Sequence, residues 1–342
     1  MYLLSFFTKI FHYLPGELSH HLALNMLKLA NSTGILKILI GRDFICNESD
    51  ELNLFPEIPN QLKGLKNRLG IAAGLDKDGE YIDCLSSLGV GHIEVGTVTP
   101  KKQSGNPKPR LFRNRKEQSL LNRLGFNNQG VEALVKNLKS KKSAIPIGVS
   151  VGKNFDTPND EAYKDYLFCM EKVYKYSSYI AINISSPNTQ DLRQLSGEEF
   201  LTNLLVRIKN KQKELSKLYD YVPIFLKISP DENDEDLKKI CESIIKHEID
   251  GIICSNTTNQ HNNKNGFGGL SGLPLKIKAT KKLSFVKKIV GDRVPIIASG
   301  GVMSPSDYQE KIDAGANLVQ IYTGFIFNGP KLIKEIVSKN SF

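Results

Sequence analysis

The sequence predicts an α/β protein whose main domain is a (β/α)8 TIM barrel, preceded by a small N-terminal helical extension. From about residue 67, short apolar runs alternate with helical stretches, and eight such runs can be counted. Because strand counts from one sequence are error-prone, a doubly wound open sheet is the alternative. The expected strands are Asn67 to Gly74, Gly91 to Val98, Pro146 to Lys153, Tyr179 to Ser186, Val222 to Ser229, Gly251 to Thr257, Pro295 to Gly301 and Leu318 to Gly324.

The N-terminal residues carry two short amphipathic patterns. Apolar residues recur at helical spacing from Leu3 to Leu14, Pro15-Gly16 breaks the pattern, and a second one runs from Leu18 to Ala30. Lys9 and Glu17 interrupt the segment well short of the ~18 apolar residues that a membrane span needs, and nothing resembles a signal peptide. Two such helices either lie on a membrane surface or pack on the main domain.

The composition of the chain indicates several classes of partner and does not select one of them. The 342-residue chain has a formal net charge of +10, which suits an anionic substrate, a lipid surface or nucleic acid, or a solvated basic surface. The five cysteines are scattered without a CxxC pair, which fits a reducing compartment. The six histidines show no ligand spacing, so we expect no metal site.

Polar or glycine residues follow every expected strand. A TIM barrel places its site at the carboxyl ends of the strands, so these residues should meet at one end of the barrel. They are Ala72 to Lys77, Gly96-Thr97, Ser150 and Lys153, Asn183 to Thr189, Lys227, Ser255 to Thr258, Ser299 to Gly301, and Tyr322 to Gly324.

The stretch Asn183 to Thr189 has the richest chemistry. Two carboxamides five residues apart offer donors and acceptors to a ring of alternating N–H and C=O groups, and the hydroxyl of Ser186 lies between them. A proline turn capped by Asn and Ser is the alternative for this motif taken alone. The following segment, Gln190 to Gly197, is the expected lid.

Two other loops are expected to contribute. Thr99 to Asn128 exceeds the ordinary loop length of ~12–15 residues, so we predict a small excursion that contributes to the pocket. Glycines at 268, 269, 272, 300, 301 and 324 expose backbone N–H groups near the last two strands, where barrels often bind phosphate. A phosphate-bearing cofactor is therefore expected.

Several motifs together resemble the dihydroorotate dehydrogenase family. They are Leu75 to Gly79, Glu94 to Pro100, Asn122 to Asn128, Asn183 to Thr189 and Gly269 to Gly272. The resemblance runs nearly end to end and is specific to the class 2, quinone-linked bacterial enzymes. Serine at 186 sorts the classes, because the soluble class 1 enzymes carry cysteine there.

The resemblance implies FMN as cofactor and oxidation of (S)-dihydroorotate to orotate in pyrimidine (UMP) synthesis. Ser186 would remove the C5 proton while hydride leaves C6 for the flavin, and Thr189 and Phe126 would border the proton path. The hydroxyl is a weak base and needs such help. The substrate-binding residues implied are Lys77, Asn122, Arg123, Leu124, Gly125, Phe126, Asn183, Asn188, Asn256 and Thr257.

The resemblance also implies the cofactor site. Lys227, inside an otherwise apolar run, would stabilise negative charge on the reduced flavin. Ser150 stands where an asparagine is common in the class, so its contact with FMN is in doubt. The implied residues are Ala73, Gly74, Leu75, Asp76, Lys77, Thr97, Ser150, Asn183, Lys227, Ser255, Gly272, Gly301, Tyr322 and Thr323.

For the N-terminal residues the resemblance implies quinone access. Residues 1–40 would form the membrane- and quinone-access segment and residues 41–342 the FMN-binding barrel. The electron acceptor would be ubiquinone or menaquinone, and the protein a peripheral one on the cytoplasmic side of the inner membrane. Flavin barrels that reduce uridines in transfer RNA are a rival, but they use a cysteine acid and an added RNA-binding domain, neither of which is evident. A non-catalytic phosphate-binding barrel is the other rival. We expect no nucleic-acid partner.

Overall fold

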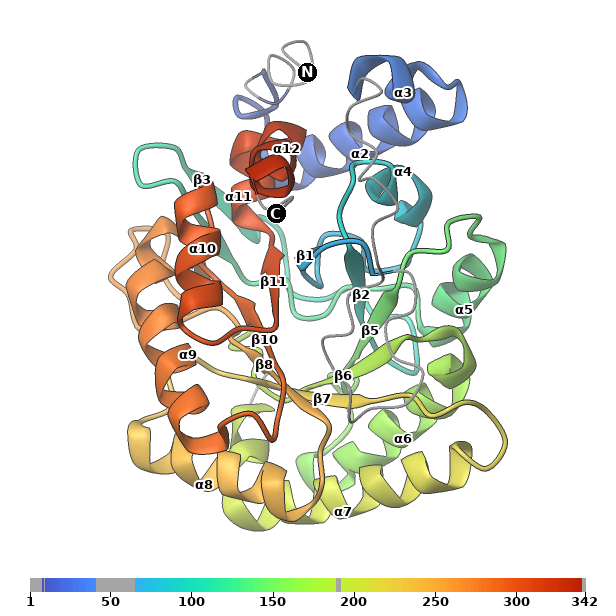
Figure 1. Ribbon diagram of the computed structural model, residues 1–342, viewed down its shortest axis with the longest axis vertical. Helices are drawn as coiled ribbons and strands as arrows, with labels where there is room; N and C mark the ends of the chain where they lie inside the picture. Colours follow the sequence, from blue (N-terminus) through green and yellow to red (C-terminus); the bar gives the residue numbers. More distant parts are fainter. Residues whose placement is uncertain (1–7, 9, 41–64, 189–191, 340–342) are drawn as a thin grey trace.

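The computed structural model describes residues 8, 10–40, 65–188 and 192–339, and its centre is a closed barrel of eight parallel strands (Figure 1). Each of the eight expected runs contributes one strand, so the predicted (β/α)8 fold is confirmed. The order around the barrel is β1-β11-β10-β8-β7-β6-β5-β2, and Gly70 pairs with Gln320 where β1 meets β11. The strands are β1 (Leu69–Ile71), β2 (His92–Val98), β5 (Ile147–Val151), β6 (Tyr179–Asn183), β7 (Ile224–Ile228), β8 (Gly251–Cys254), β10 (Ile296–Ser299) and β11 (Leu318–Ile321).

Helices cover the outside of the barrel. Side-chain caps begin two of them: Asn233 accepts from the Asp236 N–H ahead of α8, and Ser304 accepts from the Asp307 N–H ahead of α10. The α-helices are α4 (Ile82–Ser86), α5 (Val131–Ser140), α6 (Ala162–Val173), α7 (Glu198–Leu215), α8 (Asp234–Lys246), α9 (Lys276–Val290), α10 (Pro305–Asp313), α11 (Thr323–Asn328) and α12 (Pro330–Lys339). Short 3-10 helices are η2 (Asn159–Glu161), η3 (Tyr174–Tyr176), η4 (Leu192–Ser196) and η5 (Leu273–Leu275).

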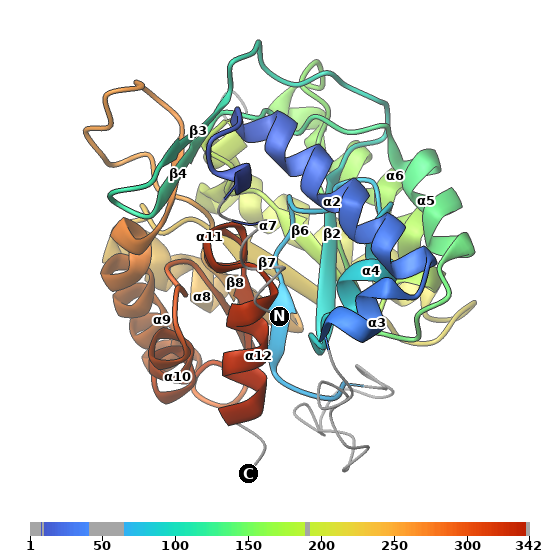
Figure 2. The same ribbon diagram turned by 90° about the horizontal axis from the view of Figure 1, so that it is seen from above.

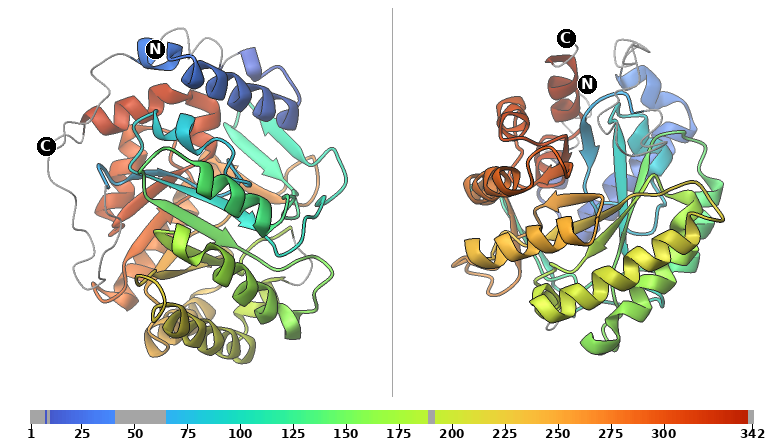
Figure 3. Two further views of the ribbon diagram at one scale, coloured as in Figure 1. Left: turned by 90° about the vertical axis from the view of Figure 1, so that its right-hand side faces the viewer. Right: turned by 60° about the horizontal axis from the view of Figure 1, so that its bottom comes forward.

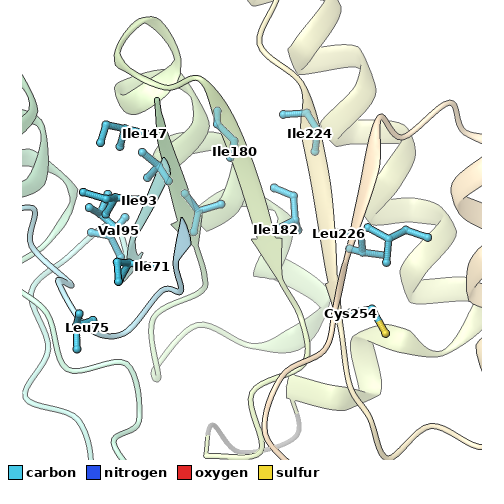
Figure 4. Packing of buried hydrophobic residues seen from close by; sticks show 14 of the residues in the cluster. Ile71, Leu75, Ile93, Val95, Ile147, Ile180, Ile182, Ile224, Leu226 and Cys254 are labelled. Atoms are coloured by element: carbon cyan, nitrogen blue, oxygen red, sulfur yellow. The ribbon is translucent and has the colours of Figure 1, made fainter. Parts of the chain in front are cut away.

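Alternation along the strands separates two cores. Side chains at alternate positions, such as Ile93, Val95, Ile180 and Ile182, pack between strands and helices, as Figure 4 shows. The other positions point into the barrel. Their apolar members form a separate cluster with Leu65, which precedes β1; these members are Tyr179, Ala181, Phe225, Ile253, Ile297 and Leu318.

Small residues make room for the large rings inside the barrel. A Cβ added at Gly148 would lie 2.0 Å from the ring of Tyr179, and one at Gly251 would lie 2.1 Å from the ring of Phe225. These glycines are therefore required by packing. Above the cluster the inward positions are polar, which places the chemistry at the carboxyl end of the barrel.

The N-terminal extension packs beside the barrel as α2 (Gly16–Ser32) and α3 (Ile35–Ile40) (Figures 2 and 3). Helix α2 contacts α4 and β3. It corresponds to the second expected helix. Half of the first expected helix, Leu3 to Leu14, lies outside the described residues, and α3 was not anticipated.

The excursion after β2 forms a second small sheet. Strands β3 (Leu111–Asn114) and β4 (Ser119–Asn122) make an antiparallel hairpin, and β4 pairs with β9 (Gly269–Gly272). The expected excursion is therefore present, and this pairing brings Asn122 opposite Gly269.

Candidate active site

A cavity opens at the carboxyl ends of the barrel strands and is walled on one side by the small sheet. It gathers residues from seven of the eight barrel strands or the loops that follow them, with β5 the exception, and from β4 and β9. The predicted site residues that line it are Ala73, Gly74, Lys77, Thr97, Asn122, Leu124, Gly125, Phe126, Asn183, Ser186, Asn188, Lys227, Ser255, Asn256, Thr257, Gly272, Gly301, Tyr322 and Thr323.

Ser186 is buried and lies next to the asparagine pair. Its Oγ accepts a hydrogen bond from the Asn188 backbone N–H at 3.3 Å. The Asn188 side chain donates to Asn122 Oδ1 at 2.8 Å, and Asn122 donates to the Gly269 carbonyl at 3.1 Å. Within the described part of the chain, Asn188 Oδ1 is buried and accepts no hydrogen bond. This oxygen is therefore available to accept a hydrogen bond from a ligand.

Lys77 supplies a cation to the same cavity. Its Nζ donates to the Gly74 carbonyl at 3.1 Å. Burial lowers the pKa of the Lys77 ammonium to about 8, although the nearby Asp78 carboxylate opposes that shift. At neutral pH this group is charged and available to a ligand carboxylate.

Asn183 and Asn256 belong to one hydrogen-bonded wall of the cavity. Asn183 donates to Thr97 Oγ1 at 2.9 Å, and Thr97 Oγ1 lies 2.8 Å from Ser150 Oγ. Asn256 donates to Asn183 Oδ1 at 3.3 Å and to Ser185 Oγ at 3.1 Å. Both amides are thus held by several partners, which fixes their orientation.

The deep end of the cavity carries a buried ion pair. Lys227 Nζ lies 3.0 Å from Glu94 Oε1, and the Glu94 carboxylate also accepts from Tyr179 and Gln320. Gln320 lines the cavity, and its Oε1 has no hydrogen-bond partner among the described residues. A ligand that offers a ring N–H at this depth would satisfy that acceptor.

Two glycines near the last strands can be no other residue. Gly272 has φ +92°, and a Cβ there would lie 2.2 Å from the Gln118 carbonyl oxygen. Gly301 has φ +77°, and a Cβ there would lie 2.2 Å from Lys276 Cα. Both line the cavity together with Thr323, so backbone amides and a hydroxyl meet where a phosphate cradle was expected.

Four of the predicted residues are placed elsewhere, and a fifth is not described. Leu75, Asp76, Ser150 and Arg123 lie outside the lining of this cavity, and Thr189 falls outside the described residues. The Asp76 carboxylate accepts from the N–H groups of Glu80 and Tyr81, which holds the loop after β1. Ser150 reaches the cavity only through Thr97, and Arg123 stacks on Phe112 and Phe267.

Sequence reasoning missed Glu94, Gln320, Leu275 and Val302 as parts of the site. The last three line the cavity, and Glu94 lies behind Lys227. The sequence did contain a signal for Glu94. A carboxylate in one buried strand and a lysine in another are expected to pair, because charged side chains are rarely buried without a partner of opposite charge. Nothing comparable marks Leu275 or Val302.

An apolar cavity of about 190 Å³ lies next to the first one, under the N-terminal extension. Two pairs of consecutive residues separate the polar cavity from the apolar one. Gly74 and Gly324 line the polar cavity, and the residues that follow them, Leu75 and Phe325, line the apolar cavity. Its other walls come from residues 8–39 and from β3, β4 and the start of α12.

Three nitrogen-bearing side chains line this apolar cavity: His12, His20 and Arg113. Arg113 donates to Ser19 Oγ at 2.7 Å and to the Phe11 carbonyl at 3.2 Å, while its buried Nε has no partner within the described ranges. Burial lowers the pKa of the His20 imidazole to about 3, so this ring is neutral.

Comparisons with known proteins agree with one another. The family profile described as "Dihydroorotate dehydrogenase" matches residues 58–340. The chain is 46% identical over 337 residues to a "Dihydroorotate dehydrogenase (quinone)" of Shewanella woodyi, covering 96% of each chain. It is 51% identical over 292 residues to one of Escherichia fergusonii, covering 83% of this chain and 87% of that one.

A solved structure of ligand-free DHODH from Eimeria tenella has a TM-score of 0.78 and 33% identity, covering 93% of this chain and 92% of that one. One of the same enzyme in complex with ferulenol has a TM-score of 0.76 at 32% identity, over 91% and 89% of the two chains. Profile, sequences and structures thus point the same way, and the chain belongs to the dihydroorotate dehydrogenase family.

Proposed function

We propose that the protein oxidises (S)-dihydroorotate to orotate in pyrimidine synthesis, with FMN in the polar cavity and a membrane quinone as electron acceptor. One observation carries this: Ser186, Lys77 and the Asn122–Asn188 pair converge in a cavity that shares a wall with an apolar one. Relatives named as quinone enzymes support the acceptor.

FMN, when bound, supplies a two-electron carrier between substrate and quinone. The residues present suit it. Gly272 and Gly301 offer backbone amides to a phosphate, and Lys227 offers an ammonium. Gln320 offers a ring N–H an amide oxygen that has no partner in the part of the chain that the structure describes. Thr97 and Asn183 complete a wall of donors. Ser150 supports this wall from behind rather than from within the cavity.

The chain's own part in the chemistry is to bind the substrate and move one proton. Lys77 binds the carboxylate of dihydroorotate, and the Asn188 carboxamide oxygen accepts from a ring N–H. Ser186 Oγ takes the proton from C5 while its own hydroxyl proton leaves along the path assigned to Thr189 and Phe126, so that the side chain ends as a neutral hydroxyl. The Asn188 backbone N–H that points at this oxygen stabilises the partial negative charge that develops on it as its own proton departs.

The apolar cavity is our proposed quinone site. Apolar walls suit the ring and tail of a ubiquinone or menaquinone, and the Nε of Arg113, which has no partner among the described residues, suits a quinone carbonyl. His20 lies on the same wall as a neutral hydrogen-bonding group.

We further propose that residues 1–40 attach the protein peripherally to the cytoplasmic face of the inner membrane, leaving residues 41–342 as the FMN-binding barrel. In the described residues of the extension, Tyr13, Leu18, Leu29 and Ile38 are exposed to between 56% and 80%. Such a face suits the boundary of a bilayer. No helix among the described residues is long and apolar enough to cross a membrane.

The test is orotate formation from dihydroorotate with three acceptors in parallel. The proposal expects turnover with a short-chain ubiquinone or menaquinone and almost none with NAD or fumarate. Turnover with NAD or fumarate but not with quinone would contradict the acceptor, and no orotate with any acceptor would contradict the substrate.

A further inference from the structure

The ion pair between Lys227 and Glu94 spans the interior of the barrel. Lys227 is on β7 and Glu94 on β2, and β6 and β5 separate these strands in the barrel order. The side chains are 6% and 0% exposed, and the two charged atoms lie 3.0 Å apart. Glu94 therefore cannot be a surface residue that happens to meet a lysine.

Three donors from three strands hold the Glu94 carboxylate. Lys227 binds Oε1, while Tyr179 and Gln320 each donate to Oε2 at 2.9 Å. Gln320 also donates to the Tyr179 hydroxyl at 2.9 Å. The Tyr179 ring is itself fixed against Gly148, so the carboxylate has one well-defined position.

A lysine buried without a partner tends to lose its proton, because burial disfavours the charged form. Lys227 is nearly fully buried, yet a carboxylate lies within hydrogen-bonding distance on the side away from the cavity. The carboxylate offsets the cost of keeping the ammonium dry.

We infer that Glu94 is a positioning residue: it keeps Lys227 protonated and fixed at the floor of the cavity, and thereby sets how readily the bound flavin accepts negative charge. This inference rests on the proposed binding of FMN. Glu94 lies behind the lysine and is absent from the cavity lining, so it acts through Lys227.

Other titratable groups near the pair have to be separated from it. Burial lowers the pKa of His92 to about 4, and burial beside Glu94 raises the pKa of Tyr179 well above its usual value, so both stay neutral near pH 7. Lys77 lines the same cavity, and burial lowers its pKa to about 8. Titration of Lys77 therefore contributes to the pH dependence of the wild-type protein, and each variant is compared with wild type at the same pH.

The test uses sulfite, which adds to oxidised flavin and leaves the ring anionic, so its affinity reports stabilisation of negative charge. Sulfite dissociation constants and flavin midpoint potentials are measured on FMN-loaded protein from about pH 6 to 9. In Glu94→Gln, Lys227 should lose its proton within this range, because burial shifts a lysine pKa by up to about 3–5 units. Between pH 6 and pH 9, we expect the sulfite affinity of Glu94→Gln to fall by a factor at least roughly 10-fold larger than the fall in wild type. The flavin midpoint potential of the variant should fall over the same range.

Matched variants identify the group responsible. The double variant Glu94→Gln/Lys227→Arg carries a cation that does not titrate in this range. The additional loss of sulfite affinity at high pH should therefore be absent from this variant. Tyr179→Phe retains the ion pair, and its sulfite affinity should stay within about 3-fold of wild type. Wild-type sulfite affinity and potential in folded, FMN-loaded Glu94→Gln across the whole range would overturn the inference.

If Glu94→Gln does not fold, the double variant Glu94→Gln/Lys227→Met decides. Recovery of a folded protein when both charges are removed supports the pairing, and equal failure of both variants overturns it. A wild-type flavin that dihydroorotate does not reduce would contradict the proposed function instead, and the sulfite comparison would still stand.

Discussion

Asn188 donates its side-chain N–H to Asn122 Oδ1 at 2.8 Å, joining the loop after β6 to the end of β4. These residues are far apart in the chain and meet only because β4 pairs with β9 beside the barrel mouth. The contact leaves Asn188 Oδ1 buried and without a partner in the described ranges. That oxygen is the group we expect a substrate ring N–H to reach.

We therefore expect Asn188→Ala to weaken orotate binding by roughly 5- to 150-fold, since an unmade buried hydrogen bond costs about 1–3 kcal/mol. Asn122→Ala should also weaken it, and the double variant should lose less than the sum of the two free energies, because each residue orients the other. Titration of the flavin absorbance with orotate measures all three. Fully additive losses would show that the two amides act separately.

The charge of Lys77 should make orotate binding depend on pH. Because burial lowers its pKa to about 8, the ammonium is present below that pH and lost above it. The ligand carboxylate stays ionised throughout, so affinity should be constant at lower pH and fall by up to about tenfold per unit above pH 8. Orotate titrations from about pH 6 to 9.5 test this.

Lys77→Met is the control for that profile. It should bind orotate weakly and with no step near pH 8. A wild-type affinity that does not change with pH, or a step that survives in the variant, would assign the carboxylate to another cation.

Arg193 ties two substrate loops to Asp231. Its Nε donates to the Ser185 carbonyl at 3.3 Å, one Nη to Asp231 at 2.9 Å and the other to the Thr257 carbonyl at 3.2 Å. Arg193→Lys cannot make all three contacts. We expect kcat/KM for dihydroorotate to fall about 10- to 100-fold with FMN content unchanged, because a small displacement of Ser186 misaligns the proton transfer.

Lys278→Met is the matched control for Arg193, because Lys278 also pairs with Asp231 and binds the loop after β8 through Thr258 Oγ1 at 3.3 Å, but makes no hydrogen bond among the described residues to the loop that carries Ser186. Its kcat/KM should stay close to wild type. If both variants lose activity equally, Asp231 acts through general stability rather than through the loop that carries Ser186.

The exposed apolar face of α2 should bind membranes. Leu22 is 41% exposed and Leu29 64%, and both are on α2. Changing both to Ser should weaken sedimentation with anionic vesicles by roughly 10-fold or more, since apolar area no longer enters the bilayer. Leu218→Ser removes a leucine that is 69% exposed three residues beyond the end of α7, a helix that lies on the far side of the barrel from α2, and should have no effect (Figure 1).

The barrel could be predicted from the sequence because each strand is short, apolar and followed by polar residues. Strand ends were expected too late: β6 ends at Asn183, whereas the run was extended to Ser186. Polar loop residues that continue an apolar run look like strand until hydrogen bonding defines its end. The polar set was predictable for the same reason, since one barrel end gathers all strand ends.

What the sequence did not reveal depends on contacts between distant segments. The pairing of β4 with β9 joins residues near 120 and 270, and no local pattern encodes it. Glu94 reads as an isolated charge within β2 until barrel closure brings it to Lys227. The positions of Leu75 and Arg123 outside the polar cavity also follow from side-chain direction, which one sequence does not specify.

The central claim is that two adjacent cavities serve two half-reactions, and anaerobic stopped-flow absorbance of the bound flavin tests it most directly. Dihydroorotate is mixed first and quinone second, for wild type, Ser186→Ala and Arg113→Gln, with FMN content and melting temperature checked beforehand. Removing a general base costs about 10²–10⁴-fold. Ser186→Ala should therefore lose flavin reduction by dihydroorotate, yet reoxidise normally with quinone after chemical reduction.

Arg113→Gln should behave in the opposite way, with normal reduction by dihydroorotate and slow reoxidation by quinone. That crossed pattern is the result the account predicts. Loss of the same half-reaction in both variants, or wild-type reduction in Ser186→Ala, would contradict it.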